Sequence, residues 1–414
     1  MRLSDEGVNH DALLWHPRQL AALDTLAGLI GQLRACENVK DGYEFQQELL
    51  RLRLAADEDR MAFRQAVRRI HSGKQPQPHA PEPQSGLDPS SLATWQIEHD
   101  VCERLGRQYR CVGDALAWRV FGFQRKYILA LSRNDPPGSM ARKAGLATEQ
   151  ATVEQAWQDG QFALMHDLTN CLRIGDITVF TDDGPRIIEV KTDPRRRNAA
   201  QERRIEAAEL ALQGAGPLPG PDSTERLYDL DVPLKTHLDV LADGTIWAAR
   251  EGIFAAKLPG ARALTVTDIF GCNVQGWTED QFNDRLKCKH DGALRRAGIG
   301  PEGRENNIHA TNLDLVARDP RRVPFAAYLL HPMACARIIS DLAVFTVETS
   351  GPALAEALCH AGLDAEWVRP PGLGDLIPGE VVIEIHRKTS RRLPGDLTLE
   401  FSRTLQIRQN WTAT

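Results

Sequence analysis

Residues 172–192 read LRIGDITVFTDDGPRIIEVKT, and this stretch constrains the fold more than any other part of the chain. Two runs rich in β-branched residues flank an Asp-Gly step, a combination that predicts a β-hairpin. The runs also carry Asp176, Glu189 and Lys191, where a sheet core favours apolar side chains. Charges inside a sheet are costly unless they are paired or hold a metal ion. The stretch therefore predicts a hairpin that carries a functional site.

Two strand registers are compatible with this hairpin. If the turn is centred between Asp182 and Asp183, Asp176 lies opposite Glu189. A turn centred one residue later places Asp176 opposite Lys191. In both registers Asp176 is a direct or diagonal neighbour of the other two charges, with Cβ atoms roughly 5–8 Å apart. Two carboxylates and an ammonium at this spacing form an oxygen-rich site for a cation such as Mg²⁺.

Regular elements are predicted on both sides of the hairpin. Helical periodicity predicts a helix over residues 146–159 that carries Glu149, followed by a first strand that begins near Phe162. Downstream, Asn198 and Gln201 have the spacing of an N-cap and its third helical residue. We expect the face of this second helix that includes Gln201 to lie on the sheet.

The order helix, strand, turn, strand, helix carries Gly-Asp-Ile at 175–177 and Glu-Val-Lys at 189–191. This pattern resembles the PD-(D/E)xK nuclease superfamily, and within it the Mrr-type and other prokaryotic defence and repair nucleases. The resemblance covers residues 146–214. It implies an α/β fold with a restriction-endonuclease-like core, in which helices flank a mixed sheet.

The same resemblance implies a metal centre in the hairpin. Asp176, Glu189 and the carbonyl of Val190 would hold one Mg²⁺, for which Mn²⁺ can substitute, and Glu149 would complete the metal shell through water. A metal ion held in this way acidifies a bound water for in-line attack on a phosphodiester.

Lys191 and Gln201 complete the implied catalytic set. Lys191 would orient or deprotonate the attacking water and offset charge on the scissile phosphate. Gln201 would position Lys191 or a phosphate oxygen. An arginine cluster beside them would contact the nucleic-acid backbone; its members are Arg195, Arg196, Arg197, Arg203 and Arg204.

The residues leave other interpretations open. Asp176 and Lys191 could form a salt bridge on a solvated sheet face, with Glu189 free. The arginine cluster could be a solvated helix start. His166-Asp167 is predicted to be part of a turn, because neighbours on a strand would point to opposite faces.

Outside the hairpin, composition and periodicity predict four segments. Residues 1–72 are predicted to form a helical hairpin arm, with a break near residues 38–42. Residues 73–91, rich in Pro, Gln and Ser, are predicted to be an extended linker. The nuclease domain would then cover residues 92–310, and a C-terminal α+β domain residues 311–414.

Within the predicted nuclease domain, three further runs have strand-like composition. They cover residues 236–240, 245–249 and 263–270, with a turn expected at Asp243-Gly244 between the first two. We expect these runs to add strands to the nuclease sheet or to form an appended β layer.

Charge and cysteine usage limit the other functional classes. The formal net charge of −6 means that contacts with nucleic acid must come from local basic patches. Neither a long apolar run nor an N-terminal leader is evident, which predicts a cytoplasmic protein without a membrane segment. The best zinc-like fragment, Cys272 with Cys288 and His290, lacks a fourth ligand, so ordinary buried thiols are favoured.

Together these patterns predict a Mg²⁺-dependent deoxyribonuclease, an endonuclease that acts on double-stranded DNA in bacterial defence. A homodimer or higher oligomer is expected, because cutting both strands of a duplex needs two sites. A partner protein encoded in the same operon is also compatible with this function. The alternatives are a DNA repair or end-processing nuclease and a catalytically silent nucleic-acid-binding protein that retains the fold.

Overall fold

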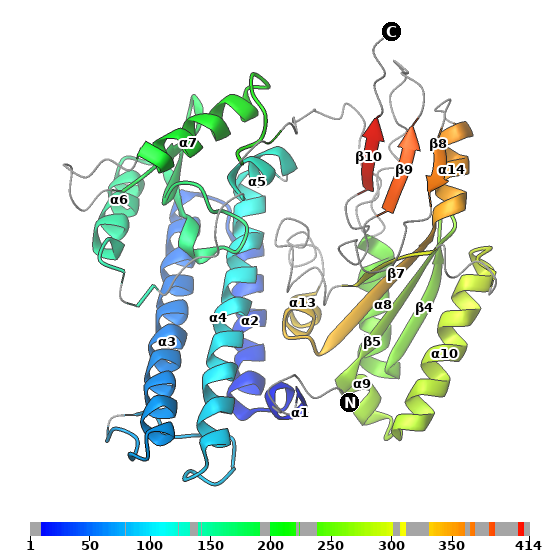
Figure 1. Cartoon of the computed structure of the whole chain (residues 1–414), viewed down its shortest axis with the longest axis horizontal. Helices are drawn as coiled ribbons and strands as arrows, with labels where there is room; N and C mark the ends of the chain where they lie inside the picture. Colours follow the sequence, from blue (N-terminus) through cyan, green and yellow to red (C-terminus); the bar gives the residue numbers. More distant parts are fainter. Residues whose placement is uncertain are drawn as a thin grey trace. The chain divides into compact units, whose positions relative to one another are not determined.

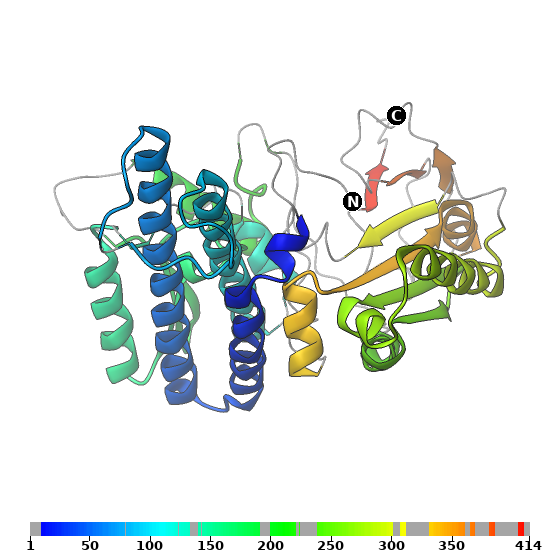
Figure 2. The same ribbon diagram turned by 90° about the horizontal axis from the view of Figure 1, so that it is seen from below.

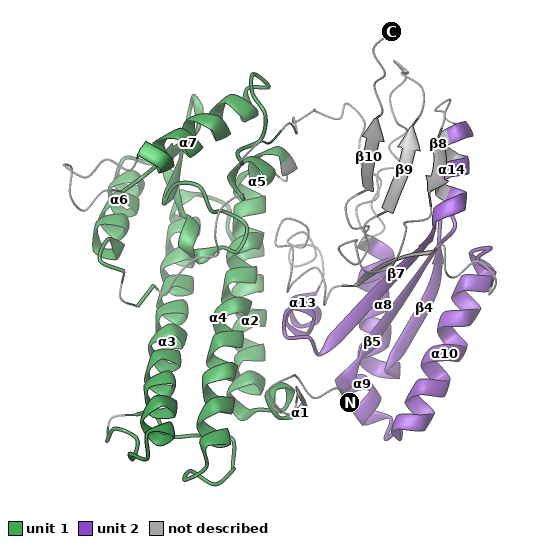
Figure 3. Cartoon of the chain, viewed as in Figure 1, with its two compact units in different colours: residues 1–229, 319–328 green, residues 230–318, 329–414 purple. Residues whose placement is uncertain are grey.

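The chain divides into two units, which are coloured separately in Figure 3. Unit 1 comprises Met1–Asp229 and Asp319–Tyr328, and unit 2 comprises Leu230–Arg318 and Leu329–Thr414. The computed structural model describes residues 10–78, 80–122, 124–132, 140–141, 143–190, 199–220, 223, 238–300, 307–311, 331–360, 365–368, 381–385 and 405–409.

In the part of unit 1 that the structure describes, helices combine with an antiparallel three-stranded sheet (Figure 1). Its elements in chain order are α1 (His10–Leu14), α2 (Pro17–Ala35), α3 (Val39–His71), α4 (Leu92–Val120), α5 (Arg125–Leu131), α6 (Leu146–Gln158), β1 (Phe162–Met165), the 3₁₀ turn η1 (His166–Leu168), β2 (Ile177–Thr181), β3 (Gly184–Ile188) and α7 (Ala199–Leu212).

Helices α2, α3 and α4 run side by side and supply much of the core of unit 1 (Figures 1 and 2). The expected break between the first two helices is present between Ala35 and Val39. Asn38 begins the second helix as its N-cap, since its side chain accepts a hydrogen bond from the Asp41 backbone N–H. Leu26, Leu49 and Val101 are fully buried, one from each helix. The predicted helical hairpin therefore packs on α4 within a single unit.

The segment between α3 and α4 is also attached to α4. Glu98 of α4 is buried, and its carboxylate accepts hydrogen bonds from the backbone N–H groups of Gln84 and Ser85. The same carboxylate contacts His16 at 3.0 Å and Arg18 at 3.1 Å. The Pro-rich segment that the sequence predicts as a linker is thus fastened to the bundle at this point.

The sheet of unit 1 has the order β1-β2-β3, and its register selects one of the two expected alternatives. Ile177 pairs with Ile188 and Thr181 with Gly184, so the turn is centred between Asp182 and Asp183. The strand predicted from Phe162 is confirmed as β1. All described pairings in this sheet are antiparallel, which differs from the mixed sheet expected of the nuclease core.

A glutamine of α3 completes the outer edge of this sheet. The Gln46 side chain donates to the Ala163 carbonyl at 2.9 Å and accepts from the Met165 N–H at 3.0 Å. It therefore pairs with β1 as the backbone of a further strand would, and satisfies buried polar groups on the edge. This contact fixes the sheet against the helical bundle.

Unit 2 contains a four-stranded antiparallel sheet of order β4-β5-β7-β6 and a smaller sheet of order β10-β9-β8. Its described elements are α8 (Leu238–Glu251), β4 (Ile253–Leu258), β5 (Arg262–Asp268), α9 (Ile269–Val274), α10 (Glu279–Arg296), β6 (Asn307–Thr311), α13 (Pro332–Ile339), β7 (Ala343–Ser350), α14 (Gly351–His360), β8 (Ala365–Val368), β9 (Val381–Ile385) and β10 (Leu405–Gln409).

Helices α8 and α10 cover opposite faces of the larger sheet. Ala263 packs in the cluster that includes Ala293 and Leu294 of α10. Val266 lies on the other face, where it and Phe254 approach Gly244 of α8. The larger sheet therefore forms the middle of a three-layer arrangement.

Two sequence expectations for this region are corrected. Residues 238–240 and 245–249, expected as strands, lie in the single helix α8, while residues 236 and 237 lie outside the described part. The run at 263–270 does form a strand, β5, which ends at Asp268. Because β5 pairs with β7, the domain boundary expected at residue 310 falls within one sheet.

The chain combines helices and strands, as the sequence predicts. Among the described residues, no helix has both the length and the apolar character that crossing a bilayer requires.

A close approach between α4 and η1 generates a test of this packing. A Cβ atom at Gly113 would lie 1.9 Å from the Leu168 carbonyl oxygen. We expect Gly113→Ala to lower the free energy of unfolding by about 1–3 kcal/mol or more, through forced displacement of η1. Urea unfolding followed by circular dichroism measures this change.

The control is Gly28→Ala, at an exposed helical position where no atom lies within 4 Å of the added Cβ. It should leave stability unchanged or raise it by about 0.5–1 kcal/mol. Equal effects of the two substitutions would contradict the packing of η1 on α4.

Candidate active site

Three carboxylates converge on the ammonium of Lys143. Its Nζ atom lies 2.6 Å from Glu149 Oε1, 2.7 Å from Asp167 Oδ2 and 3.2 Å from Asp176 Oδ1. The Glu149 side chain is 1% exposed, whereas Asp167 and Asp176 are 24% and 19% exposed. The cluster thus extends from a buried carboxylate to two that reach the surface.

Separate elements bring these acids together. Glu149 lies in the first turn of α6, Asp167 in η1, and Asp176 directly before β2. The register that pairs Ile177 with Ile188 places Glu189 opposite Asp176 when it is continued by one residue. Two of the acids predicted from the hairpin therefore lie across from each other.

Hydrogen bonds hold Asp176 in place at the end of the strand pair. Its backbone N–H donates to the Ile188 carbonyl at 2.9 Å, and its carbonyl accepts from the His166 N–H at 2.9 Å. Its Oδ2 accepts from the Val190 N–H at 2.9 Å. Val190, predicted to offer its carbonyl to a metal ion, therefore also fixes Asp176 through its N–H group.

Gly175 makes the turn that delivers Asp176 to this position. Its φ of +76° is in the left-handed region, and an added Cβ would lie 2.5 Å from Ile187 Cγ2. His166 braces the turn, since its Nδ1 lies 3.0 Å from the Gly175 carbonyl oxygen. A carbonyl only accepts, so Nδ1 carries the proton and Nε2 accepts from the Thr178 hydroxyl at 2.7 Å.

Helix α4 anchors the loop between η1 and β2. Asp114 Oδ1 accepts from the backbone N–H groups of Asn170 at 2.6 Å and Cys171 at 2.8 Å. Its Oδ2 accepts from the Asn170 side chain at 2.9 Å. Burial raises the pKa of Asp114 to about 6, although these donors favour the ionised form.

The charges of the cluster are strongly coupled. Burial acts to lower the pKa of Lys143, but the attraction of Asp167 and the bonds to Glu149 and Asp176 raise it above its ordinary value. Burial also raises the pKa of Glu149, against the opposing effect of Lys143. Three carboxylates and one ammonium leave these four side chains with two negative charges when all are ionised. The cluster can accept further positive charge.

The donor set fits a divalent cation such as Mg²⁺ or Mn²⁺. Carboxylate oxygens are the ligands that these ions prefer. Glu149 Oε2 is buried and has no hydrogen-bond partner within the described part of the chain, so it is an available ligand atom. Asp176, Glu189 and Val190 stay the predicted metal ligands, with Glu149 as the predicted neighbour of the ion.

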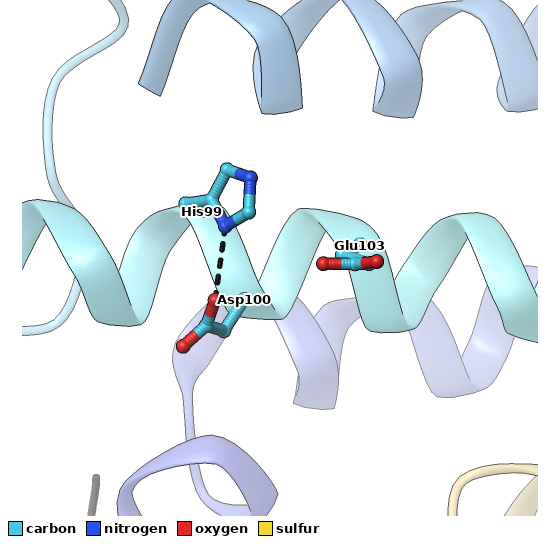
Figure 4. A group of neighbouring side chains, drawn as sticks. All are labelled: His99, Asp100 and Glu103. Atoms are coloured by element: carbon cyan, nitrogen blue, oxygen red, sulfur yellow. Dashed lines mark hydrogen bonds and ion pairs between the residues drawn. The ribbon is translucent and has the colours of Figure 1, made fainter. Parts of the chain in front are cut away.

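Another acidic group, on the surface of α4, comes closer to metal-ligand spacing. His99, Asp100 and Glu103 bring one ligand atom each within 4.8 Å of one another (Figure 4). His99 Nδ1 contacts Asp100 Oδ1 at 2.9 Å. All three come from a single helix and Glu103 is exposed, an arrangement common on helix surfaces without a metal ion.

The structure locates the remaining predicted residues as follows. Gln201 lies in α7 and accepts a hydrogen bond from Arg204 at 3.5 Å. Arg203 and Arg204 are exposed on the same helix, which packs against α5. Lys191 and the arginines at 195–197 lie outside the described residues.

Sequence reasoning missed two members of the cluster, Lys143 and Asp167. Lys143 lies in the turn before α6, where no periodic pattern relates it to the hairpin. Asp167 belongs to the His-Asp step that was predicted as a turn, and the turn is confirmed as η1. That turn, rather than a strand, directs Asp167 toward Asp176.

The zinc-like fragment is not assembled. Cys288 is exposed, and His290 instead contacts Glu348 at 2.7 Å and Thr265 at 2.9 Å. Cys272 lies in α9, whereas the other two residues lie in α10. Cys272 is partly buried and Cys288 is exposed, so these two thiols are not the buried thiols that the sequence predicts.

No family model matches the chain, and comparison with curated proteins and with solved structures also gives no match.

The buried His166 predicts a pH dependence of stability. Burial lowers its pKa to about 4, whereas an unfolded histidine titrates near pH 6.5. Between these values the unfolded state binds more protons, so stability present above about pH 6.5 is lost as the pH falls toward 4. We expect this group to cost on the order of 2–3 kcal/mol over that range.

The control for this pH dependence is His166→Gln, because glutamine does not titrate between pH 4 and 6.5. Urea unfolding at several pH values, in buffer with a chelator, should show wild-type stability falling more steeply than that of the variant. Equal pH slopes would contradict a neutral, buried His166.

Proposed function

We propose that this chain is a metal-dependent nuclease that hydrolyses phosphodiester bonds in double-stranded DNA. The observation that carries the proposal is the hairpin register, which sets Asp176 opposite Glu189 beside the buried Glu149. Glu149 of the preceding helix and Asp176 of the hairpin both contact the Lys143 ammonium, so the acids of the two elements lie close to one another. This agrees with the arrangement implied by the PD-(D/E)xK resemblance.

The roles follow from the chemistry of each group. A bound Mg²⁺ acidifies a water molecule and offsets negative charge on the phosphate. Asp176 and Glu189, with the Val190 carbonyl, would hold the ion, while Glu149 would bind a water of its shell. The hydrogen bond from the Val190 N–H keeps Asp176 Oδ1 directed toward the cluster.

Lys191 is proposed to act on the attacking water. It follows Glu189 by two residues, and such residues share a face of an extended segment. Its ammonium would orient the water and stabilise the charge that develops on the phosphate in the transition state. Gln201 would position Lys191 or a phosphate oxygen.

Basic side chains near the cluster are proposed to contact the DNA backbone. The cluster at 195–197, 203 and 204 supplies five arginines close to the metal-binding hairpin in sequence. Arg173 adds positive charge on the side of η1, where it lies close enough to Asp167 to be influenced by its charge. These local charges would bind phosphates despite the negative net charge.

We further propose that the protein acts in the cytoplasm as a homodimer, as an endonuclease of bacterial defence. Two sites related by a twofold axis suit cleavage of both strands of a duplex. DNA repair or end processing is the alternative activity, and the topology of the substrate that is cut distinguishes the two.

One observation favours a catalytically silent binding protein instead. Lys143 already neutralises part of the cluster, as an ion pair without a metal would. A silent protein would bind DNA in a salt-dependent manner but leave it uncut.

Plasmid cleavage with Mg²⁺ tests the proposal. Asp176→Asn, Glu189→Gln and Lys191→Ala should each lower the cleavage rate by about a hundredfold or more, since each removes a metal ligand or the group that acts on the water. The matched control is Asp183→Asn, an exposed carboxylate in the turn of the same hairpin, which should cleave as the wild type does.

Supercoiled, linear and single-stranded substrates separate endonuclease activity from end processing. Unchanged cleavage in the three site variants would refute the site assignment. Absence of cleavage of every substrate, with retained DNA binding, would favour the silent protein.

A further inference from the structure

We propose that Lys143 is a tethered cation that occupies the carboxylate cluster when no metal is bound, and that a divalent ion must displace it to bind. This inference rests on the proposed metal site. The Lys143 ammonium and the metal ion would compete for the same carboxylates, so that only one of them is bound at a time.

The contacts of Lys143 are those of a ligand in a prepared site. Its three donors match three acceptors, one each from Glu149, Asp167 and Asp176, at 2.6, 2.7 and 3.2 Å. Among the described residues, His99, Asp100 and Glu103 can bring one ligand atom each within 4.8 Å of one another, and the three carboxylates around Lys143 do not. With Lys143 in place, the carboxylates are therefore spaced for an ammonium, which lies where they converge.

Lys143 can leave without unfolding the sheet. It belongs to a turn, where its N–H donates to the Met140 carbonyl and its carbonyl accepts from the Leu146 N–H. Its side chain is 28% exposed and carries the charge on a flexible four-carbon stem. A change of side-chain rotamer would move the ammonium toward solvent while the turn stays in place.

The burial of Glu149 means that the cluster needs one cation or the other at all times. A carboxylate that is 1% exposed is strongly destabilised when it has no cationic partner. Loss of Lys143 from the cluster is therefore compensated when a divalent ion arrives. Conversely, the ion has to overcome the three contacts of Lys143, which weakens its apparent affinity.

Asp167 gains a role from the same geometry. It contacts Lys143 at 2.7 Å but lies outside the hairpin that supplies the other acids. It would hold the ammonium in the metal-free state and thereby set the metal concentration at which the site fills.

Titration calorimetry with Mn²⁺, in the absence of DNA, tests the displacement. Lys143→Met and Lys143→Gln should bind Mn²⁺ about tenfold or more tightly than the wild type, a change that corresponds to about 1.4 kcal/mol. Without metal, both variants should also have a lower melting temperature than the wild type. Adding Mn²⁺ should raise the melting temperature of the variants by more than it raises that of the wild type. The Gln variant retains a hydrogen-bond donor, which guards against loss of folding.

The control is Lys40→Met, which removes the same charge from an exposed pair with Glu44. Its Mn²⁺ affinity should equal that of the wild type. Unchanged or weaker Mn²⁺ binding in both Lys143 variants would overturn the displacement.

The outcome is separable from that of the nuclease proposal. If the wild type cleaves plasmid DNA and the Lys143 variants bind Mn²⁺ as the wild type does, the nuclease proposal is supported and the displacement of Lys143 is refuted. If the variants bind Mn²⁺ more tightly and no DNA is cleaved, the displacement of Lys143 is supported and the nuclease proposal is contradicted.

Discussion

Asp176 joins three segments of the chain at one point, and the geometry of the candidate site depends on that junction. Its backbone bonds to His166, the first residue of η1 directly after β1, and to Ile188 at the end of β3. Its carboxylate bonds to the Val190 N–H through one oxygen and to Lys143 through the other. The residue that would bind a metal ion is therefore held at the ends of both neighbouring strands.

The side chains around this junction are mostly charged, and carboxylates outnumber the ammonium group. The cluster carries more negative charge than Lys143 neutralises, and Glu149 is buried within it. Such an imbalance is expensive in a structural ion pair but useful where a metal ion and a phosphate meet. Hydrogen bonds anchor the sheet and the loop that follows η1, whereas Lys143 is the member of the cluster that we propose can move.

Local patterns predicted the elements that carry the site. The periodicity around Glu149 predicts α6, and the two β-branched runs around the Asp183-Gly184 step predict the β2–β3 hairpin. The turn itself is formed by Asp182 and Asp183, because Gly184 already pairs with Thr181. The choice between two registers was not available from sequence, because both place apolar residues on one face. The structure decides it through the turn between Asp182 and Asp183.

Other features depend on contacts between distant residues. Gly244 looked like part of a turn, but it lies inside α8, where Phe254 and Val266 leave no room for a side chain. The spacing of Leu241, Thr245 and Ala248 in the sequence was the signal for that helix, and the structure buries all three. Lys143 and Asp167 reach the cluster from a turn and from η1, positions for which no local pattern exists.

We propose that the carboxylates around Asp176 form a metal centre. Anomalous diffraction from crystals of the wild-type protein soaked in Mn²⁺ tests it most directly. We expect a peak within bonding distance of Asp176 and Glu189, with the Lys143 ammonium moved away from the carboxylates. A peak at His99, Asp100 and Glu103 alone, with Lys143 still bound to Glu149, would contradict it.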